Sequence, residues 1–180
     1  MHKEIAQARR DAGLSQVEVA KRLHISLRLY QGIEYGDHLN PEQALQLSRV
    51  LNAPALTMTF CKQNCPIGRV SGYEVLNNVD LAPLAVLTKY RQESEEASIA
   101  VNKLQLLLLN KRGAADCTPA ELDQIADCAD ELLDEAHTIA LALLQISRFV
   151  DIPKVYSDHH NKCLSRGYHD TRKPALIKAG

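Results

Sequence analysis

Apolar residues in the second half of the chain recur at alternating steps of three and four over two long stretches. The first stretch comprises Leu87, Tyr90, Ser94, Ala97, Val101, Leu104 and Leu108, and the second comprises Leu122, Ile125, Ala129, Leu132, Ala136, Ile139, Leu143, Ile146 and Val150. Sustained over about 4 heptads, this spacing predicts two helices that each turn an apolar side toward another helix. Basic residues and a glycine at 110–113 favour a helix end, and Thr-Pro-Ala-Glu at 118–121 favours a new helix start. Residues 79–152 are therefore expected to form a long antiparallel hairpin.

Residues 1–60 show shorter amphipathic segments separated by capping and turn signals. A first helix is expected over residues 2–12, with Ile5 and Ala8 on its inner side and Arg9 and Arg10 outside. Asn-Pro-Glu-Gln at 40–43 combines an N-cap, a proline at the first helical position and an amide at the third. The helix that follows has a predicted buried stripe, and two later residues are expected to close the small core: Ala44, Leu47, Val50 and Leu51, then Leu56 and Phe60.

Between these segments, residues 13–36 predict two short helices joined by a tight turn. Ser15 stands at an N-cap with Glu18 three positions later, and Ser26 can cap a second helix that runs to about residue 35. The first helix is expected to turn Val17, Ala20 and Leu23 to one face, and the second to turn Tyr30 and Ile33 inward. A buried seam between two such helices is the helix-turn-helix pattern.

The sequences Gly-Leu-Ser-Gln at 13–16, Val-Ala at 19–20, Leu23, Ile-Ser at 25–26 and Ile-Glu-Tyr-Gly at 33–36 resemble the Xre/Cro/lambda-repressor family. The resemblance covers about residues 5–60. It implies a bundle of about five helices, usually dimeric on double-stranded DNA, whose third helix enters the major groove. It also implies the DNA-binding residues Gln16 toward a phosphate, Arg28 and Gln31 toward base edges, Leu27 and Leu29 toward thymine methyl groups, and Ser26 and Gly32 on the same helix.

Three residues depart from the family pattern and put the DNA target in doubt. His24 replaces the glycine that is usual in the turn, so it must accept an unusual backbone conformation or reshape the turn. Gly32 lies inside the recognition helix, where it costs about 1 kcal/mol of helix propensity. Tyr30 occupies a position normally held by a small branched aliphatic residue.

Taken together, these patterns predict an all-α protein. We expect a helix-turn-helix domain over residues 1–60, a linker over 61–78, the hairpin over 79–152 and a C-terminal tail over 153–180, with one more short helix at 154–166 and a loose end. No run of about 20 apolar residues is present, which argues against a membrane partner, and the N-terminus lacks an apolar signal core. We therefore expect a cytoplasmic protein.

Charge is distributed unevenly along the chain. Residues 1–65 have a net charge of +2, residues 79–150 have six basic and twelve acidic residues, and residues 151–180 have six basic and three acidic residues. A slightly basic head on an acidic body fits DNA binding at one end, although many domains that bind no DNA have a similar charge.

A single hairpin of this length cannot bury all its apolar surface. Its helices also carry Leu106, Leu107, Leu109, Leu133, Ala140 and Leu144 beside the predicted seams. A second copy of the hairpin would cover them in a four-helix homodimer. The alternative is a monomer whose hairpin folds back on the DNA-binding head or the tail.

The cysteines and histidines offer a further possibility. Cys61 and Cys65 in the linker and His160 and Cys163 near the end could together supply sulfur and imidazole ligands for zinc. Their spacing matches no strong zinc pattern, so ordinary reduced thiols are the competing interpretation. Cys117 and Cys128 are expected to be small core or surface residues.

Acidic clusters at residues 93–96 and 127–135 resemble paired catalytic carboxylates, but the solvated face of an amphipathic helix has the same pattern. No phosphate-binding loop, nucleophile elbow or HExxH sequence is present, so we expect no enzyme. The sequence predicts a sequence-specific transcriptional regulator, a repressor that binds an inverted repeat as a homodimer. The alternatives are an antitoxin or adaptor that binds another protein through the hairpin, and a metal- or redox-responsive regulator.

Overall fold

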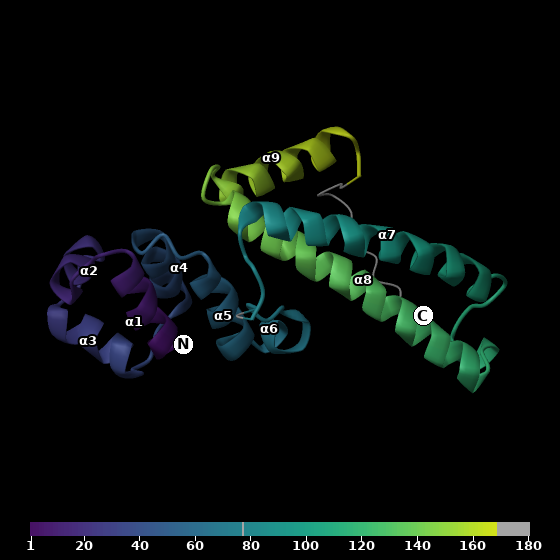
Figure 1. Ribbon diagram of the computed structural model, residues 1–180, viewed down its shortest axis with the longest axis horizontal. Helices are drawn as coiled ribbons and strands as arrows, with labels where there is room; N and C mark the ends of the chain where they lie inside the picture. The colour runs from purple at the N-terminus through teal and green to yellow at the C-terminus, as the bar shows by residue number, and fades with distance from the viewer. Residues whose placement is uncertain (77, 169–180) are drawn as a thin grey trace. The chain divides into compact units, whose positions relative to one another are not determined.

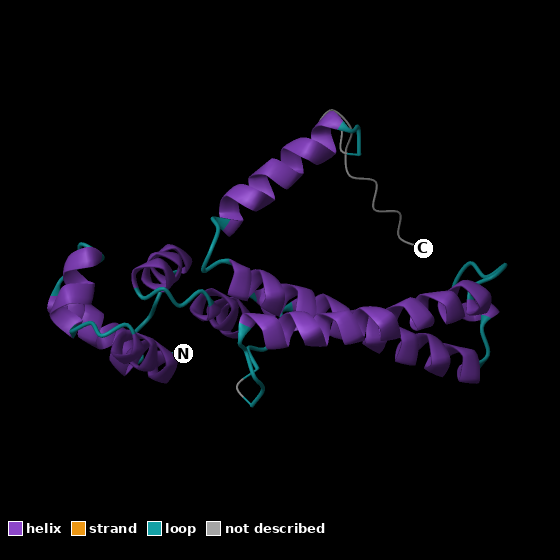
Figure 2. Cartoon of the chain, turned by 45° about the horizontal axis from the view of Figure 1, so that its top comes forward, coloured by secondary structure: helices purple, strands orange, loops and turns teal. Residues whose placement is uncertain are grey.

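A computed structural model describes residues 1–76 and 78–168 and confirms the predicted all-α fold, since these residues form helices and loops without a strand. The chain divides into two compact units, Met1–Val79 and Asp80–Gly180 (Figure 1). Figure 2 shows the same chain coloured by secondary structure. No helix in the described residues has the length and apolar character needed to span a membrane.

The first unit is a small bundle of short helices around one apolar core. Its helices are α1 (His2–Asp11), α2 (Gln16–Arg22), α3 (Leu27–Tyr35), α4 (Pro41–Val50), α5 (Ala55–Asn64) and α6 (Pro66–Ser71). The largest fully buried side chains are Tyr30, Ile5, Leu47 and Val19. Leu56 is buried and Phe60 packs against this core, as the sequence predicts.

The helix starts follow the predicted capping residues. Ser15 and Asn40 both form complete capping boxes, the first with Glu18 and the second with Gln43. Four successive helices end alike, each followed by a residue with positive φ: Gly13, His24, Gly36 and Asn52. In each case the amide of this residue and the amide of the residue after it donate hydrogen bonds to carbonyls near the end of the helix, which the helix itself leaves unpaired.

Two predicted side-chain orientations in this unit are wrong. Val17 is 59% exposed, and Val19 occupies the core position beside Ala20 instead. Arg9 does not point into solvent: its side chain is 16% exposed and forms an ion pair with the almost fully buried carboxylate of Glu34. A segment with apolar residues at 17, 19 and 20 fits two helical faces, and only packing against the neighbouring helices selects one.

A buried hydrogen-bond network centred on Glu34 ties α1, α2 and α3 together. Arg9 Nε and the Tyr30 hydroxyl donate to Glu34 Oε1 over 2.6 and 2.7 Å, and Gln16 Nε2 donates to Oε2 over 2.7 Å. Arg9 Nη1 also donates to the Leu14 carbonyl over 3.0 Å, which fixes the loop between α1 and α2. Burial and the carboxylate raise the pKa of Tyr30, so its hydroxyl remains a proton donor.

The segment expected to be a linker contains more helix than the sequence suggests. The last turn of α5 extends to Asn64, and α6 follows directly after Cys65 and packs against α5. Pro66 does not prevent helix formation here, because it occupies the first position of α6, where a missing N–H costs nothing. The first unit therefore continues to Val79.

The second unit contains the predicted antiparallel hairpin. Helix α7 (Pro83–Leu107) packs along α8 (Pro119–Ile146), and a short 3₁₀ turn, η1 (Ala114–Asp116), lies in the connection (Figures 1 and 2). Lys111 joins the connection to the start of α8 through an ion pair with Glu121 of 2.8 Å. This bond, with those from Thr118 of the capping box, lowers the pKa of Glu121 to about 2.

The contact between α7 and α8 follows the predicted seams only in part. The buried residues of α7 are Val86, Glu93, Ala97 and Ala100, and those of α8 are Cys128, Thr138, Leu141, Ala142 and Gln145. Of the predicted seam residues only Ala97 is in this buried set, and several others, such as Tyr90, Leu104 and Leu132, are half-buried. Polar residues therefore lie among apolar ones between the helices.

The last described helix is α9 (Ile152–Ser165), capped by Asp151, with none of its residues buried. It matches the short helix expected at about 154–166. Residues 169–180 of the expected tail lie outside the described residues.

The Glu34 network predicts a specific dependence of stability on pH. Burial disfavours the charged carboxylate, but the hydrogen bonds from Arg9, Tyr30 and Gln16 outweigh it and lower the pKa of Glu34 from its ordinary value of 4.5. A carboxyl group with a depressed folded-state pKa contributes stability above its unfolded pKa, and this contribution is lost as the pH falls through the folded value.

We expect Glu34→Gln to lower the urea midpoint at pH 7, because it leaves Arg9 without its buried partner. Between pH 7 and about pH 3 the variant should lose less stability than the wild type, since the Glu34 contribution is already gone. Glu42→Gln, at an exposed position of α4, is the matched control and should follow the wild-type pH curve. Parallel curves for the wild type and Glu34→Gln would contradict this account.

Candidate nucleic-acid interface

The turn between α2 and α3 is held by backbone hydrogen bonds and carries the unusual residue His24. His24 has a φ of 54°, so of the two alternatives predicted for this residue it adopts the unusual, left-handed backbone. Its amide donates to the Lys21 carbonyl over 3.2 Å, and the Ile25 amide donates to the Ala20 carbonyl over 3.0 Å. Ser26 then caps α3 by accepting a hydrogen bond from the Leu29 amide over 3.1 Å. The turn therefore fixes where α3 begins.

Helix α3 is buried on one side and exposed on the other, as predicted. Tyr30 is fully buried and Ile33 is 2% exposed, so both anchor the helix to the core. On the opposite side Leu27 is 38% exposed and Leu29 is 42% exposed. Arg28 lies between them and is exposed. Within the described part of the chain, no protein group forms a hydrogen bond or ion pair with its guanidinium group, which leaves five N–H donors available to a ligand.

The two glutamines of the predicted interface are connected to each other and to the core. Gln31 Nε2 donates to Gln16 Oε1 over 3.2 Å, and Gln16 Nε2 donates to Glu34 over 2.7 Å. The order of donors along this chain sets the orientation of the Gln31 amide. Sequence spacing indicates that Gln16 and Gln31 lie near the turn, but the carboxylate that orients them becomes evident only in the fold.

Gly32 lies at the edge of the α3 surface, beneath an acidic side chain. A Cβ atom built at Gly32 would lie 2.1 Å from Asp37 Oδ2. Because Asp37 is exposed, this carboxylate can move aside. The Asp37 amide also donates to the Gly32 carbonyl over 2.9 Å, so the end of α3 folds back over the glycine. Helix α3 is continuous from Leu27 to Tyr35 despite the propensity cost of Gly32.

The hairpin presents an uncovered apolar face of its own. In an antiparallel pair of helices, residues one position after each buried position lie on the same side of the pair. On the α7–α8 hairpin, Leu87, Val101 and Ile139 each follow a buried residue, and Leu108 and Leu122 each follow a half-buried one. These five residues are between 38% and 48% exposed, and we call them the hairpin apolar face. All five belong to the two apolar stretches of the sequence. Those stretches therefore contribute to this exposed face as well as to the contact between α7 and α8.

The residues of the expected zinc site fall into both units. Cys61 and Cys65 belong to the first unit, where Cys61 lies in the last turn of α5 and Cys65 directly follows that helix. His160 and Cys163 belong to α9 in the second unit, where Cys163 Sγ lies 3.5 Å from His159 Nε2. Cys128 is buried in the hairpin, in agreement with a core role, and Cys117 lies in the connection before α8. The four-residue zinc set stays a prediction.

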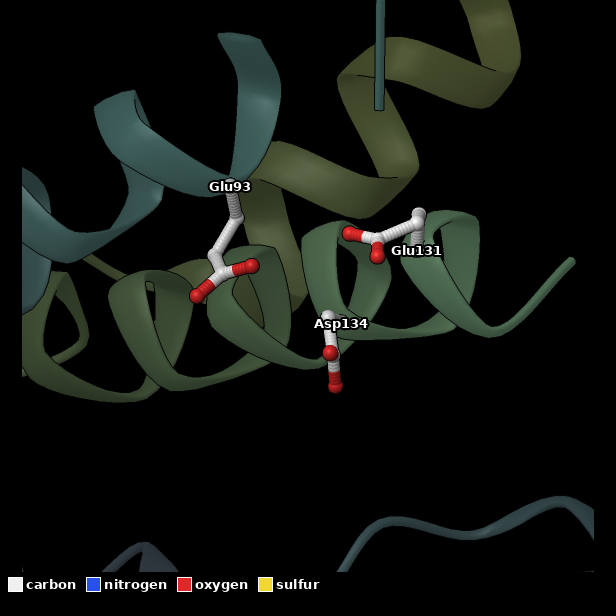
Figure 3. Close-up of side chains that lie close together, drawn as sticks. All are labelled: Glu93, Glu131 and Asp134. Atoms are coloured by element: carbon white, nitrogen blue, oxygen red, sulfur yellow. The ribbon is translucent and has the colours of Figure 1, made fainter. Parts of the chain in front are cut away.

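A different group of possible metal ligands occurs in the hairpin. Carboxylate oxygens of Glu93, Glu131 and Asp134 lie within 4.8 Å of one another, and Figure 3 shows the three side chains on facing helices. Lys89 forms an ion pair with Glu93, and this hydrogen bond raises the pKa of Lys89. The sequence pattern favours a solvated face for these carboxylates. For Glu93 that interpretation is wrong, because its side chain is only 6% exposed.

A comparison with protein families matches residues 5–56 to a helix-turn-helix family, over α1 to α4 and the start of α5. The match agrees with the range of the resemblance found in the sequence. Neither the curated proteins nor the solved structures yield a match to this chain. The family match and the capped α2–turn–α3 geometry agree that the first unit contains a DNA-binding helix-turn-helix domain of the Xre/Cro/lambda-repressor type, the type found in transcriptional regulators.

Proposed function

We propose that this protein is a sequence-specific repressor that binds an inverted-repeat operator as a homodimer. The exposed side of α3, with the unpaired guanidinium of Arg28 between Leu27 and Leu29, carries this proposal. A repressor needs only to occupy its operator, and a DNA-binding unit joined to a dimerising unit is sufficient for that task.

The side chains of α3 suit direct reading of bases in the major groove. Arg28 can donate two hydrogen bonds to the O6 and N7 atoms of guanine, and Gln31 can pair with the edge of adenine. Leu27 and Leu29 supply apolar contacts for thymine methyl groups. Gln16 supports Gln31 through its 3.2 Å hydrogen bond and would face the phosphate backbone beside it.

Dimerisation is supported by the hairpin apolar face. Between α7 and α8 the buried residues include the polar Glu93, Thr138 and Gln145, so the contact within one chain is only partly apolar. Gln145 Oε1 is buried without a hydrogen-bond partner among the described residues, which weakens this contact further. A second hairpin laid on the apolar face would bury its five large side chains and form a four-helix bundle.

Selection of bound duplexes from a random DNA pool tests the proposed function. We expect the full chain to enrich one motif with two inverted half-sites about 10 base pairs apart, or a multiple of that spacing. A single half-site would contradict the dimeric mode. Failure to enrich any motif, with no gel shift at low salt, would contradict DNA reading altogether.

Arg28→Ala tests the assignment of base reading on the selected duplex. We expect a loss of about 1–3 kcal/mol in binding free energy, together with relaxed preference at one base position. Arg112→Ala, an exposed arginine in the hairpin connection, is the matched control and should bind as the wild type does. An equal loss on all sequences would show that Arg28 contacts a phosphate instead.

Light scattering of the full chain tests the dimer. We expect twice the 20.0 kDa chain mass for the wild type and the single-chain mass for Val101→Glu, which places a charge in the hairpin apolar face. Asn102→Glu, at an exposed position of the same helix, is the control and should stay dimeric. A monomeric wild type would contradict the homodimer and favour the alternative adaptor, in which the same face binds a different protein.

A further inference from the structure

Gln31 is connected to the buried carboxylate of Glu34 through one intervening side chain, the amide of Gln16. Glu34 Oε2 accepts a hydrogen bond from Gln16 Nε2 over 2.7 Å, and Gln16 Oε1 accepts one from Gln31 Nε2 over 3.2 Å. The side chain of Glu34 is 6% exposed, whereas Gln16 and Gln31 are half-buried. This row of hydrogen bonds therefore leads from the core of the first unit to the surface of α3 that is proposed to face DNA.

We propose that Glu34 is a positioning residue that determines which base Gln31 reads, because it fixes the direction of both amides. The inference rests on the proposed DNA binding and adds to it a source of base preference. Glu34 is ionised in its ion pair with Arg9, and an ionised carboxylate accepts hydrogen bonds but donates none. Gln16 must therefore turn its NH₂ group toward Glu34 and its carbonyl oxygen toward Gln31. Gln31 must in turn direct its own NH₂ group toward Gln16.

This direction leaves a defined pattern of hydrogen-bonding groups on the outer side of Gln31. Gln16 takes one N–H of the Gln31 amide, which leaves the second N–H as a donor and Oε1 as an acceptor. Adenine presents the complementary pair in the major groove, an acceptor at N7 and a donor at N6, whereas guanine presents two acceptors, N7 and O6. The observed direction of the amide therefore matches adenine and places two acceptors against each other at guanine.

Replacement of Glu34 by glutamine should reverse the direction of the whole row. Glu34 Oε1 accepts from Arg9 Nε over 2.6 Å and from the Tyr30 hydroxyl over 2.7 Å, so the oxygen of the new amide belongs at this position. The NH₂ group then takes the place of Oε2, whose only other contact is with Arg9 Nη2 at a longer distance of 3.4 Å among the described residues. From there it donates to Gln16, which must accept through Oε1 and donate to Gln31. Gln31 then turns its NH₂ group outward, and two N–H donors match guanine.

Base preferences of the full chain on the duplex selected from the random pool test this inference. Gln31→Ala identifies the base pair that Gln31 reads, as the position where the preference disappears. At this position we expect the wild type to bind adenine over guanine by about 5–150-fold in dissociation constant, and Glu34→Gln to bind guanine more tightly than adenine. The preference at the position read by Arg28 should not change, because Arg28 lies outside this row of hydrogen bonds.

A second variant tests the same inference without disturbing the buried ion pair. Gln16→Met interrupts the row, so the Gln31 amide can take either direction, and adenine and guanine should bind about equally. Glu42→Gln and Gln46→Met, both at exposed positions of α4, are the matched controls and should keep the wild-type preference for adenine. If circular dichroism shows that Glu34→Gln does not fold, the result for Gln16→Met decides.

Three results would overturn the inference while leaving the proposed DNA binding in place. One is a selected duplex in which no base preference depends on Gln31. Another is a wild-type preference for a base other than adenine at the Gln31 position. The third is an adenine preference that persists unchanged in folded Glu34→Gln or in Gln16→Met. Failure to select any duplex would instead contradict the proposed function itself, and the inference with it.

Discussion

The buried carboxylate of Glu34 is the interaction on which the DNA-binding unit depends. It lies on α3 and accepts hydrogen bonds from an arginine of α1, a glutamine of α2 and a tyrosine of α3 itself. A buried charge is stable only when it is fully paired, so the three helices can adopt few other relative positions. The same carboxylate orients Gln16, and Gln16 in turn orients Gln31. The orientation of side chains on the surface proposed to face DNA therefore depends on a buried charge.

The hairpin follows a different physical principle. Between α7 and α8, polar side chains such as Thr138 and Gln145 are buried together with Leu141 and several alanines, and the buried Glu93 is neutralised by Lys89. Such a contact uses part of its buried surface for polar groups. Larger residues on the hairpin apolar face are left for another surface. A hairpin arranged in this way suits association better than isolated stability.

The junction between α5 and α6 is ordered by chain geometry alone. One helix ends at Asn64, another begins at Pro66, and Gly68 brings their backbones together. These features turn a segment that resembles a flexible linker in sequence into an ordered part of the first unit.

The sequence by itself determined where most of the helices begin. Ser15, Asn40 and Thr118 cap helices as predicted, because a cap depends on residues within about one turn. Only the tertiary structure decided which side of each helix is buried. Apolar residues one or two positions apart, such as those at 17 and 19 or at 100 and 101, lie on different faces of a helix. Either face could be the buried one, and the neighbouring helix selects between them. Other features likewise depend on residues that meet only when separate helices pack. These are the inward orientation of Arg9, the burial of Glu93 and the close approach of Gly68 to Cys61.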